Sequence, residues 1–399
     1  MHGPLEGIRV VEVGNYMAAP FCTLQLADLG AEVIKVENPA GGDQVRQAGP
    51  FLGDQSSPFL RLNRNKRSLA LDLKPAAGKA VFRRLVESAD VVVENLRPGT
   101  MARLELDHAR LAETNQGLIY VAVSGWGQDG PLAPLAGLDI MAQARSGLMS
   151  ITGEVGGDPV KVGVPICDLV CALYGALAAV SALRARDQTG QGQFIDVSLL
   201  EAGVSLTIWE AGQYFATGEV PGPHGSAHQN NAPYQAVRAA DGWVTIGATT
   251  PRNWPAFCRA LGLERLLQNE RYATNAGRFE DRSELIAQIE AVTSTAPVAH
   301  WLEVLGAAGV PCAPIQDIAQ VYADPHLNTR GYFWEGIHPT LGSVRQLGSP
   351  MRLATTPPCR DSSAPLLGEH TLAVLELLGY TDEELRDLRD QQVISSPEP

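Results

Sequence analysis

The sequence lacks long apolar runs and contains little cysteine. No stretch of about 20 residues is apolar and uncharged throughout, so a transmembrane helix is not expected. The nearest candidate, Leu169–Leu183, contains Tyr174 and Gly175 and predicts a buried helix. The first residues show no basic start followed by an apolar core, so we expect no signal peptide. The six cysteines are sparse and mostly lie in apolar contexts, which indicates reduced thiols in a cytoplasmic protein.

Basic residues are also in short supply. Lys and Arg number 31 against 44 Asp and Glu, which gives a net charge of −13. A protein this acidic repels nucleic acids and anionic membrane surfaces, so we expect neither as a partner. The 399 residues are 45% hydrophobic and 19% charged, which is typical of a globular enzyme with about two to three domains and excludes long disorder.

Strand and helix patterns alternate through residues 1–125. Helical patterns cover Met17–Leu29, which stops at Gly30, and a segment opened by Pro75. The apolar positions of this second helix share one face: Val81, Phe82, Leu85 and Val86. The predicted strands are 8–13, 32–36, 68–73, 90–93 and 118–123. Strands joined by crossover helices predict an α/β fold with a Rossmann-like parallel sheet covered on both faces.

The second half of the chain indicates a domain boundary. Residues 124–163 are rich in Gly and Pro, as a site carried on loops would be. Residues 218–234 (GEVPGPHGSAHQNNAPY) form the clearest break, and we expect a linker over 218–240. A smaller α/β unit is expected from Asp241 onward, with helices near 252–261, 282–293 and 297–307.

A dinucleotide site is disfavoured. The turn Gly14–Ala19 follows a strand but lacks the second and third glycines that let the backbone approach a pyrophosphate. A literal G-x-G-x-x-G occurs over 125–130, but Pro131 and Pro134 follow it, so no helix N-terminus is available to hold a phosphate.

The sequence contains no motif that is typical of a metal site or of an α/β-hydrolase. His224 and His228 are four residues apart, but the surrounding Gly and Pro deny them a helix face. Cys167 and Cys171 have no second pair at ligand spacing, so no metal is expected. The absence of a Gly-x-Ser-x-Gly elbow argues against an α/β-hydrolase.

A basic segment, residues 61–67 (RLNRNKR), stands out in an acidic protein. It is either a solvated loop or a site that captures a phosphorylated small molecule through bidentate guanidinium contacts. Arg97 and Arg103 follow the predicted strand 90–93 and could add to the same positive field.

Asp168 begins the long apolar helix. Pro165 precedes it, and no other charge lies between Lys161 and Arg184. One interpretation is a helix N-cap. The other is a nucleophile, because the helix dipole favours an ionised carboxylate at this position and an ionised carboxylate can attack a carbonyl carbon.

The chain resembles the class III coenzyme A transferases, relatives of formyl-CoA and carnitine CoA transferases. The resemblance spans nearly the whole length and depends on the order and spacing of short motifs. They are L5EGIRVVE12, A19P20, L29GAEVIKVE37, G42D43, N65KRS68, V93ENLRPG99, G125WGQDGP131, S146GLMSITG153, the Asp168 segment and P365LLGEH370.

The resemblance implies a fold and an assembly. A large CoA-binding domain would span residues 1–217 and be completed by 333–399, with the linker 218–240 leading to a small α/β domain at 241–332. Two such chains would form an interlocked homodimer.

The resemblance also implies site residues. Asp168 would be the nucleophile that forms an acyl anhydride and then an aspartyl-CoA thioester. Coenzyme A would be a co-substrate, with no other cofactor and no metal. Its contacts would be Tyr16, Met17, Ala18, Leu71, Lys74, Asn95, Leu96, Arg97 and Arg103. A family arginine contact is replaced here by Asn38.

For the substrates, the pattern is similar to relatives that take CoA from succinyl-CoA or another dicarboxylyl-CoA and pass it to a carboxylic acid. Candidate contacts for the acyl group are Arg46, Leu138 and His228, with Arg145 as a further cation.

Two alternatives stay open from the sequence. A racemase branch of the family needs a His before the Asp of a Gly-His-Asp motif, but here the motif reads Gly137-Leu138-Asp139, and leucine cannot transfer a proton. The other alternative is a noncatalytic CoA-binding subunit, which would bind CoA without forming an adduct on Asp168.

Overall fold

Short runs of β-branched residues form one seven-stranded sheet in the computed structural model, which describes residues 3–397. The sheet order is β14-β5-β2-β1-β6-β7-β8. The strands are β1 (Arg9–Val13), β2 (Glu32–Glu37), β5 (Lys66–Leu71), β6 (Val91–Glu94), β7 (Ile119–Ser124), β8 (Gln193–Ser198) and β14 (Ile394–Ser395). The pairs from β5 through β8 are parallel, whereas β14 pairs antiparallel with β5. The predicted α/β fold with a parallel sheet is confirmed.

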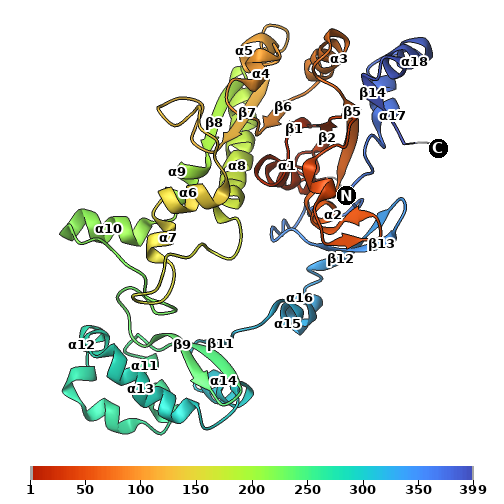
Figure 1. Cartoon of the computed structure of the whole chain (residues 1–399). Coiled ribbons are helices and arrows are strands. Elements are labelled where there is room, and N and C mark those ends of the chain that lie inside the picture. Colours follow the sequence, from red (N-terminus) through yellow and green to blue (C-terminus); the bar gives the residue numbers. More distant parts are fainter. Residues whose placement is uncertain (1–2, 398–399) are drawn as a thin grey trace. The chain divides into compact units, whose positions relative to one another are not determined.

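Helices cover both faces of this sheet (Figure 1). On one face lie α3 (Ala76–Glu87), α4 (Thr100–Arg103), α5 (His108–Leu111), α17 (Thr371–Leu377) and α18 (Asp382–Asp390). The apolar side of α3 is buried as predicted, at Val81, Phe82, Leu85 and Val86. The other face is covered by α1 (Ala18–Asp28) and α8 (Ile166–Thr189), which also contact each other.

Shorter elements complete this part of the chain. They are η1 (Gln44–Gln47), β3 (Phe51–Leu52), β4 (Gln55–Ser56), α2 (Ser57–Leu62), α6 (Asp139–Arg145), α7 (Leu148–Ile151), α9 (Leu199–Val204), α10 (Ile208–Thr217), β12 (Phe333–His338) and β13 (Gly342–Leu347). The segment after β13 returns to the sheet, where β14 and α17 contact β5 (Figure 1). The predicted capping box of Thr381 and Glu384 begins α18.

By its internal contacts the chain divides into two compact units. The first contains residues 3–148, 161–212 and 328–397, and the second contains 149–160 and 213–327. The second unit has its own antiparallel sheet in the order β11-β10-β9. Its elements are β9 (Tyr234–Ala239), β10 (Gly242–Gly247), α11 (Asn253–Ala260), η2 (Glu264–Gln268), η3 (Glu270–Tyr272), α12 (Asn275–Glu280), α13 (Arg282–Thr293), α14 (Val298–Ala307), β11 (Cys312–Pro314), α15 (Ile318–Ala323) and α16 (Pro325–Thr329). The last part of the expected linker, Tyr234–Ala239, is therefore a strand of this sheet.

Helix α8 is long and apolar enough to cross a membrane by length and composition alone, with a mean hydropathy of 2.0 in its most apolar window. In the structure α8 packs on β7, β8 and α1. Of its most apolar stretch, 44% is buried inside the protein. Leu173, Tyr174 and Leu177 on its outer side are 43–62% exposed. The predicted buried helix is thus buried on one face, and its other face lies open in the single chain.

Candidate active site

A cavity of about 610 Å³ opens at the carboxyl edge of the sheet, where the ends of β1, β6 and β7 meet the beginnings of α6, α8 and α9. Loops that follow parallel strands gather at this edge, which is where open α/β sheets bind ligands. Six of the predicted site residues line the cavity: Tyr16, Met17, Ala18, Asn95, Leu138 and Asp168.

Asp168 is the third residue of α8 and is half-buried. The helix begins after Pro165, whose side chain cannot cap it. Asp139 supplies the cap from α6, because its Oδ1 accepts hydrogen bonds from the backbone N–H of Cys167 (2.9 Å) and of Asp168 (3.3 Å). The interpretation of Asp168 as the N-cap is therefore wrong, and its carboxylate faces the cavity instead.

Burial and, to a smaller extent, the nearby negative charge of Asp139 together raise the pKa of Asp168 to about 7. We expected the helix N-terminus to keep this carboxylate ionised, and that expectation is wrong for the free enzyme. The reason is that burial and the charge of Asp139 outweigh the helix N-terminus, where two of the N–H groups donate to Asp139 and not to the Asp168 carboxylate. With a pKa near 7, about half of the Asp168 side chains are ionised at neutral pH.

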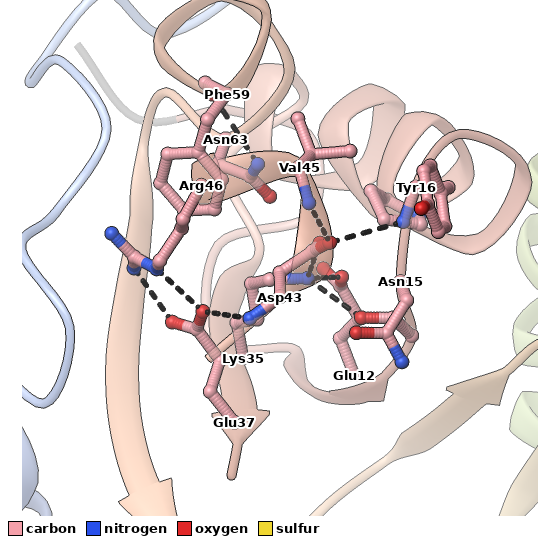
Figure 2. A network of polar contacts seen from close by, with 12 residues as sticks. Glu12, Asn15, Tyr16, Lys35, Glu37, Asp43, Val45, Arg46, Phe59 and Asn63 are labelled. Carbon is pink, nitrogen blue, oxygen red and sulfur yellow. Dashed lines mark hydrogen bonds and ion pairs between the residues drawn. The ribbon is translucent and has the colours of Figure 1, made fainter. Parts of the chain in front are cut away.

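The turn after β1 forms the opposite part of the cavity wall and is held by two side chains from other elements. Asn95 accepts a hydrogen bond from Asn15 N (3.0 Å) and donates one to Asn15 O (2.8 Å). Asp43 Oδ1 accepts from Tyr16 N (3.1 Å) and from Val45 N (3.0 Å), as Figure 2 shows. Tyr16 lies in the left-handed region with φ 62°, which costs a non-glycine residue about 1–2 kcal/mol and persists here because both anchors hold the turn.

Beneath this turn lies a buried ion network (Figure 2). Lys35 Nζ lies 2.6 Å from Glu12 Oε1 and 2.9 Å from Asp43 Oδ2, and it donates to Gly14 O at 2.8 Å. Lys66 Nζ pairs with Glu12 Oε2 at 2.9 Å. Burial acts to raise the pKa of Glu12, but the charges of Lys35 and Lys66 outweigh it and hold this pKa at about 2. The turn that carries Tyr16 is thus attached to a buried network of ion pairs.

The basic segment 61–67 is neither a solvated loop nor an open phosphate site. Arg64 forms a buried bidentate pair with Asp28. Lys66 belongs to the ion network above, and Arg67 pairs with Glu32 at 2.6 Å. A strand begins at Lys66. Arg64 and Lys66 are neutralised by the buried acids Asp28 and Glu12, and Arg67 is neutralised by the partly exposed Glu32.

Arg46 also contacts other protein groups and does not line the cavity. Its guanidinium forms two 2.7 Å hydrogen bonds with Glu37, donates to Pro365 O and stacks 3.8 Å from the centroid of the Phe59 ring. Its charge is already neutralised by Glu37, so the structure does not bring Arg46 together with the other predicted site residues, and its contact with a substrate carboxylate stays a prediction.

Other predicted contacts lie outside the cavity. Leu71 ends β5 and is buried against β14, Leu96 packs on the sheet core, and Lys74, Arg97 and Arg103 are exposed. These residues follow the carboxyl ends of β5 and β6, the same edge as the cavity. Arg145 is exposed at the end of α6, and His228 belongs to the second unit, where it stacks on Tyr234 with ring centroids 5.0 Å apart.

Two cavity residues were undervalued by the sequence analysis. Asp139 was considered only as part of a racemase motif, and Lys161 only as the edge of an uncharged stretch. A cap supplied from another helix has no fixed sequence spacing, so no local signal identifies it. Within residues 3–397, no group of three or more His, Cys, Asp and Glu could hold a metal ion.

Comparison with known proteins shows likeness over nearly the whole chain. Among solved structures, a CAIB/BAIF family protein from Brucella suis matches with a TM-score of 0.86 and 36% identity, covering 95% of this chain and 100% of that chain. The chain is 36% identical over 397 residues to the Homo sapiens succinyl-CoA:glutarate CoA-transferase, covering 99% of this chain and 91% of the human protein. It is also 36% identical over 392 residues to the succinyl-CoA:mesaconate CoA-transferase of Haloarcula marismortui, covering 94% and 97% of the two chains.

The fold is thus that of a CAIB/BAIF family protein. The model of CoA-transferase family III matches residues 5–371. The chain therefore belongs to CoA-transferase family III and is an enzyme that transfers CoA, which confirms the resemblance seen in the sequence.

The anchoring of the Tyr16 turn predicts the effect of Asp43→Asn. This change removes one charge from a buried network and leaves Lys35 partly uncompensated, so the free energy of unfolding should fall by about 3–5 kcal/mol in urea titrations. Asp54→Asn, the same change at an exposed position, should shift it by less than about 0.5 kcal/mol. Equal stability of the Asp43 variant and the wild type would contradict this account.

The Asp139–Asp168 pair predicts a pKa change. Asp139→Asn keeps an oxygen that can cap α8 but removes the negative charge, so the pKa of Asp168 should fall from about 7 toward its ordinary value. Carbon-13 NMR titration of labelled aspartates, assigned with Asp168→Asn, measures this shift. Glu201→Gln on the neighbouring α9 serves as a control and should leave the pKa of Asp168 unchanged; a similar fall in both variants would refute the role of Asp139.

Proposed function

We propose that this enzyme moves CoA from a dicarboxylyl-CoA, such as succinyl-CoA, to a carboxylic acid acceptor by covalent catalysis at Asp168. The observation that carries the proposal is a carboxylate without a side-chain partner among the described residues, held at the start of α8 in a 610 Å³ cavity. The names of the relatives support the substrate class, since both the human and the archaeal enzymes are described as succinyl-CoA:dicarboxylate transferases.

The reaction begins with ionised Asp168. One carboxylate oxygen attacks the thioester carbonyl carbon, the C–S bond breaks, and the CoA thiolate leaves with the electron pair, giving a mixed anhydride. The thiolate then attacks the Asp168 carbonyl carbon and expels the donor acid as a carboxylate, which leaves an aspartyl-CoA thioester. An acceptor carboxylate repeats these two steps in reverse order and leaves as the new acyl-CoA. One thioester is consumed and one is formed, so the free energy of the thioester is conserved and the scheme needs no ATP; none of its steps is assigned to a metal.

Two features of the cavity are relevant to these steps. The raised pKa of Asp168 makes its ionised form a stronger nucleophile than an ordinary aspartate while leaving a large fraction ionised near neutral pH. Gly125 and Gly137 approach so closely in the cavity wall that a Cβ on either would lie 2.8–2.9 Å from the Cα of the other, so this part of the wall requires glycine at both positions.

For CoA, we propose the sheet edge beside the cavity. The turn at Tyr16, Met17 and Ala18, together with Asn95, would receive the pantetheine end. Leu71 and Leu96 lie along the same edge, and the exposed cations there would bind the phosphates: Lys74, Arg97 and Arg103. Holding CoA in this way keeps its sulfur next to Asp168 and makes each transfer step effectively intramolecular.

Leu138 favours the transferase over a racemase. Its side chain lines the cavity with Asp168 and is 63% exposed, at the position where the racemase motif has a histidine. A hydrocarbon side chain cannot give or accept a proton, so the two-base exchange at the α-carbon lacks one of its bases.

A covalent trap tests the proposal. Enzyme incubated with acyl-CoA and then with hydroxylamine or borohydride should be modified on the peptide that carries Asp168, as read by mass spectrometry. Asp168→Asn should abolish both the adduct and CoA exchange, whereas the matched change Asp187→Asn, at an exposed residue of the same helix, should preserve both. Exchange at the wild-type rate by Asp168→Asn would refute the mechanism, and CoA binding without adduct or exchange would favour a noncatalytic subunit.

We also propose a cytoplasmic, interlocked homodimer. The outer side of α8 and the residues after it expose a set of large apolar side chains in the single chain: Leu173, Tyr174, Leu177, Val204, Leu206 and Ile208. A soluble enzyme rarely leaves such a face uncovered, and a second copy would bury it. Sedimentation equilibrium should give twice the mass of 42.6 kDa across dilution; a monomer at assay concentrations would refute the dimer.

A further inference from the structure

Three charged residues line the cavity among the described residues: Asp139, Lys161 and Asp168. The Asp139 carboxylate is fully engaged, since it accepts hydrogen bonds from Cys167 N, Asp168 N and Gln143 Nε2. Asp168 is assigned to the reacting carbon. Lys161, the one cation among these three residues, has no role in the proposed reaction scheme.

The ammonium group of Lys161 has no acidic partner within 4 Å in the described part of the chain. Its one hydrogen bond is to the neighbouring carbonyl, Val162 O, at 3.2 Å. It is exposed and does not pair with Asp168, although both side chains line the same cavity. A cavity lined by a nucleophile and by a cation without an acidic partner suits a ligand that carries a carbonyl at one end and a negative charge at the other.

A buried glutamine holds the backbone beside Lys161 in place. Gln143 is fully buried, its Oε1 accepts from Val162 N (2.9 Å), and its Nε2 donates to Asp139 Oδ2 (2.7 Å). Asp139 in turn caps the helix that carries Asp168. The segment of Lys161 is thus held by Gln143 and the nucleophile by Asp139, and a hydrogen bond joins these two side chains of α6, so both are positioned by the same helix.

We propose that Lys161 binds the unreacted carboxylate of a dicarboxylyl group and so selects dicarboxylates over monocarboxylates. This inference rests on the proposed function at Asp168. A dicarboxylate brings a second negative charge into a cavity that already holds two carboxyl groups, and like charges repel. The Lys161 ammonium, which has no other counter-ion, offsets that repulsion and forms a charge-assisted hydrogen bond with the terminal carboxylate. It forms no such bond with the methyl terminus of a monocarboxylyl group.

The test compares acyl-CoA pairs that differ in the terminal carboxylate: succinyl-CoA with butyryl-CoA, and glutaryl-CoA with pentanoyl-CoA. The kcat/KM of CoA exchange is measured for the wild type, Lys161→Met and Lys161→Arg. Lys79→Met, on α3 and outside the cavity, is the matched control. Lys161→Met should lower kcat/KM about 10- to 100-fold for the dicarboxylyl member of each pair and leave the other member unchanged. Lys161→Arg should keep most of the preference, and Lys79→Met should resemble the wild type.

Other outcomes overturn the inference in distinguishable ways. An equal loss for both members of a pair would assign Lys161 to a CoA phosphate or to the fold, and thermal melting separates these two. A wild type that does not prefer the dicarboxylyl member, or a Lys161→Met variant that keeps the preference, would refute the role of Lys161 while leaving Asp168 intact. Absence of an Asp168 adduct and of exchange in the wild type would instead refute the proposed function itself.

Discussion

The contact on which the cavity depends most is the buried ion pair between Lys35 and Asp43. Lys35 lies within the second strand of the sheet, where its ammonium is neutralised by Glu12 and Asp43. A buried charge is tolerated only when it is paired, so these three residues must lie where they do. Asp43 then uses its other oxygen to hold Tyr16 in a left-handed turn. The electrostatics of the core thereby determine the shape of the cavity wall.

On the other side of the cavity, too, one carboxylate has two roles. Asp139 accepts hydrogen bonds from the N–H groups of the second and third residues of α8 and lies close enough to Asp168 to raise its pKa. A helix N-terminus that is already capped stabilises a further carboxylate less, and burial then dominates. Asp139 therefore both stabilises the start of α8 and contributes to the raised pKa of Asp168. Structural and chemical roles are carried by one contact.

Much of the fold could be predicted because helices and strands depend on the local spacing of apolar residues along the sequence. Apolar residues on one face predicted α3, and short β-branched runs predicted β1, β2, β6 and β7 to within a few residues. Asp168 and the Tyr16 turn were identified through family motifs and do line the same cavity. The ion pairs of Arg46 and of the basic segment 61–67 could not be predicted, because the sequence does not show whether a cation is neutralised by a ligand or by a buried acid.

The sequence by itself determined the order of strands and helices, the family and the residue at the head of α8, since these depend on neighbours along the chain. Tertiary structure alone decided which charges are available to a ligand. Glu12, Lys35 and Lys66 come from three different strands, and Asp139 reaches α8 from 28 residues upstream of Cys167. Charge pairing is a property of distance in space, and only folding brings those atoms within hydrogen-bonding range.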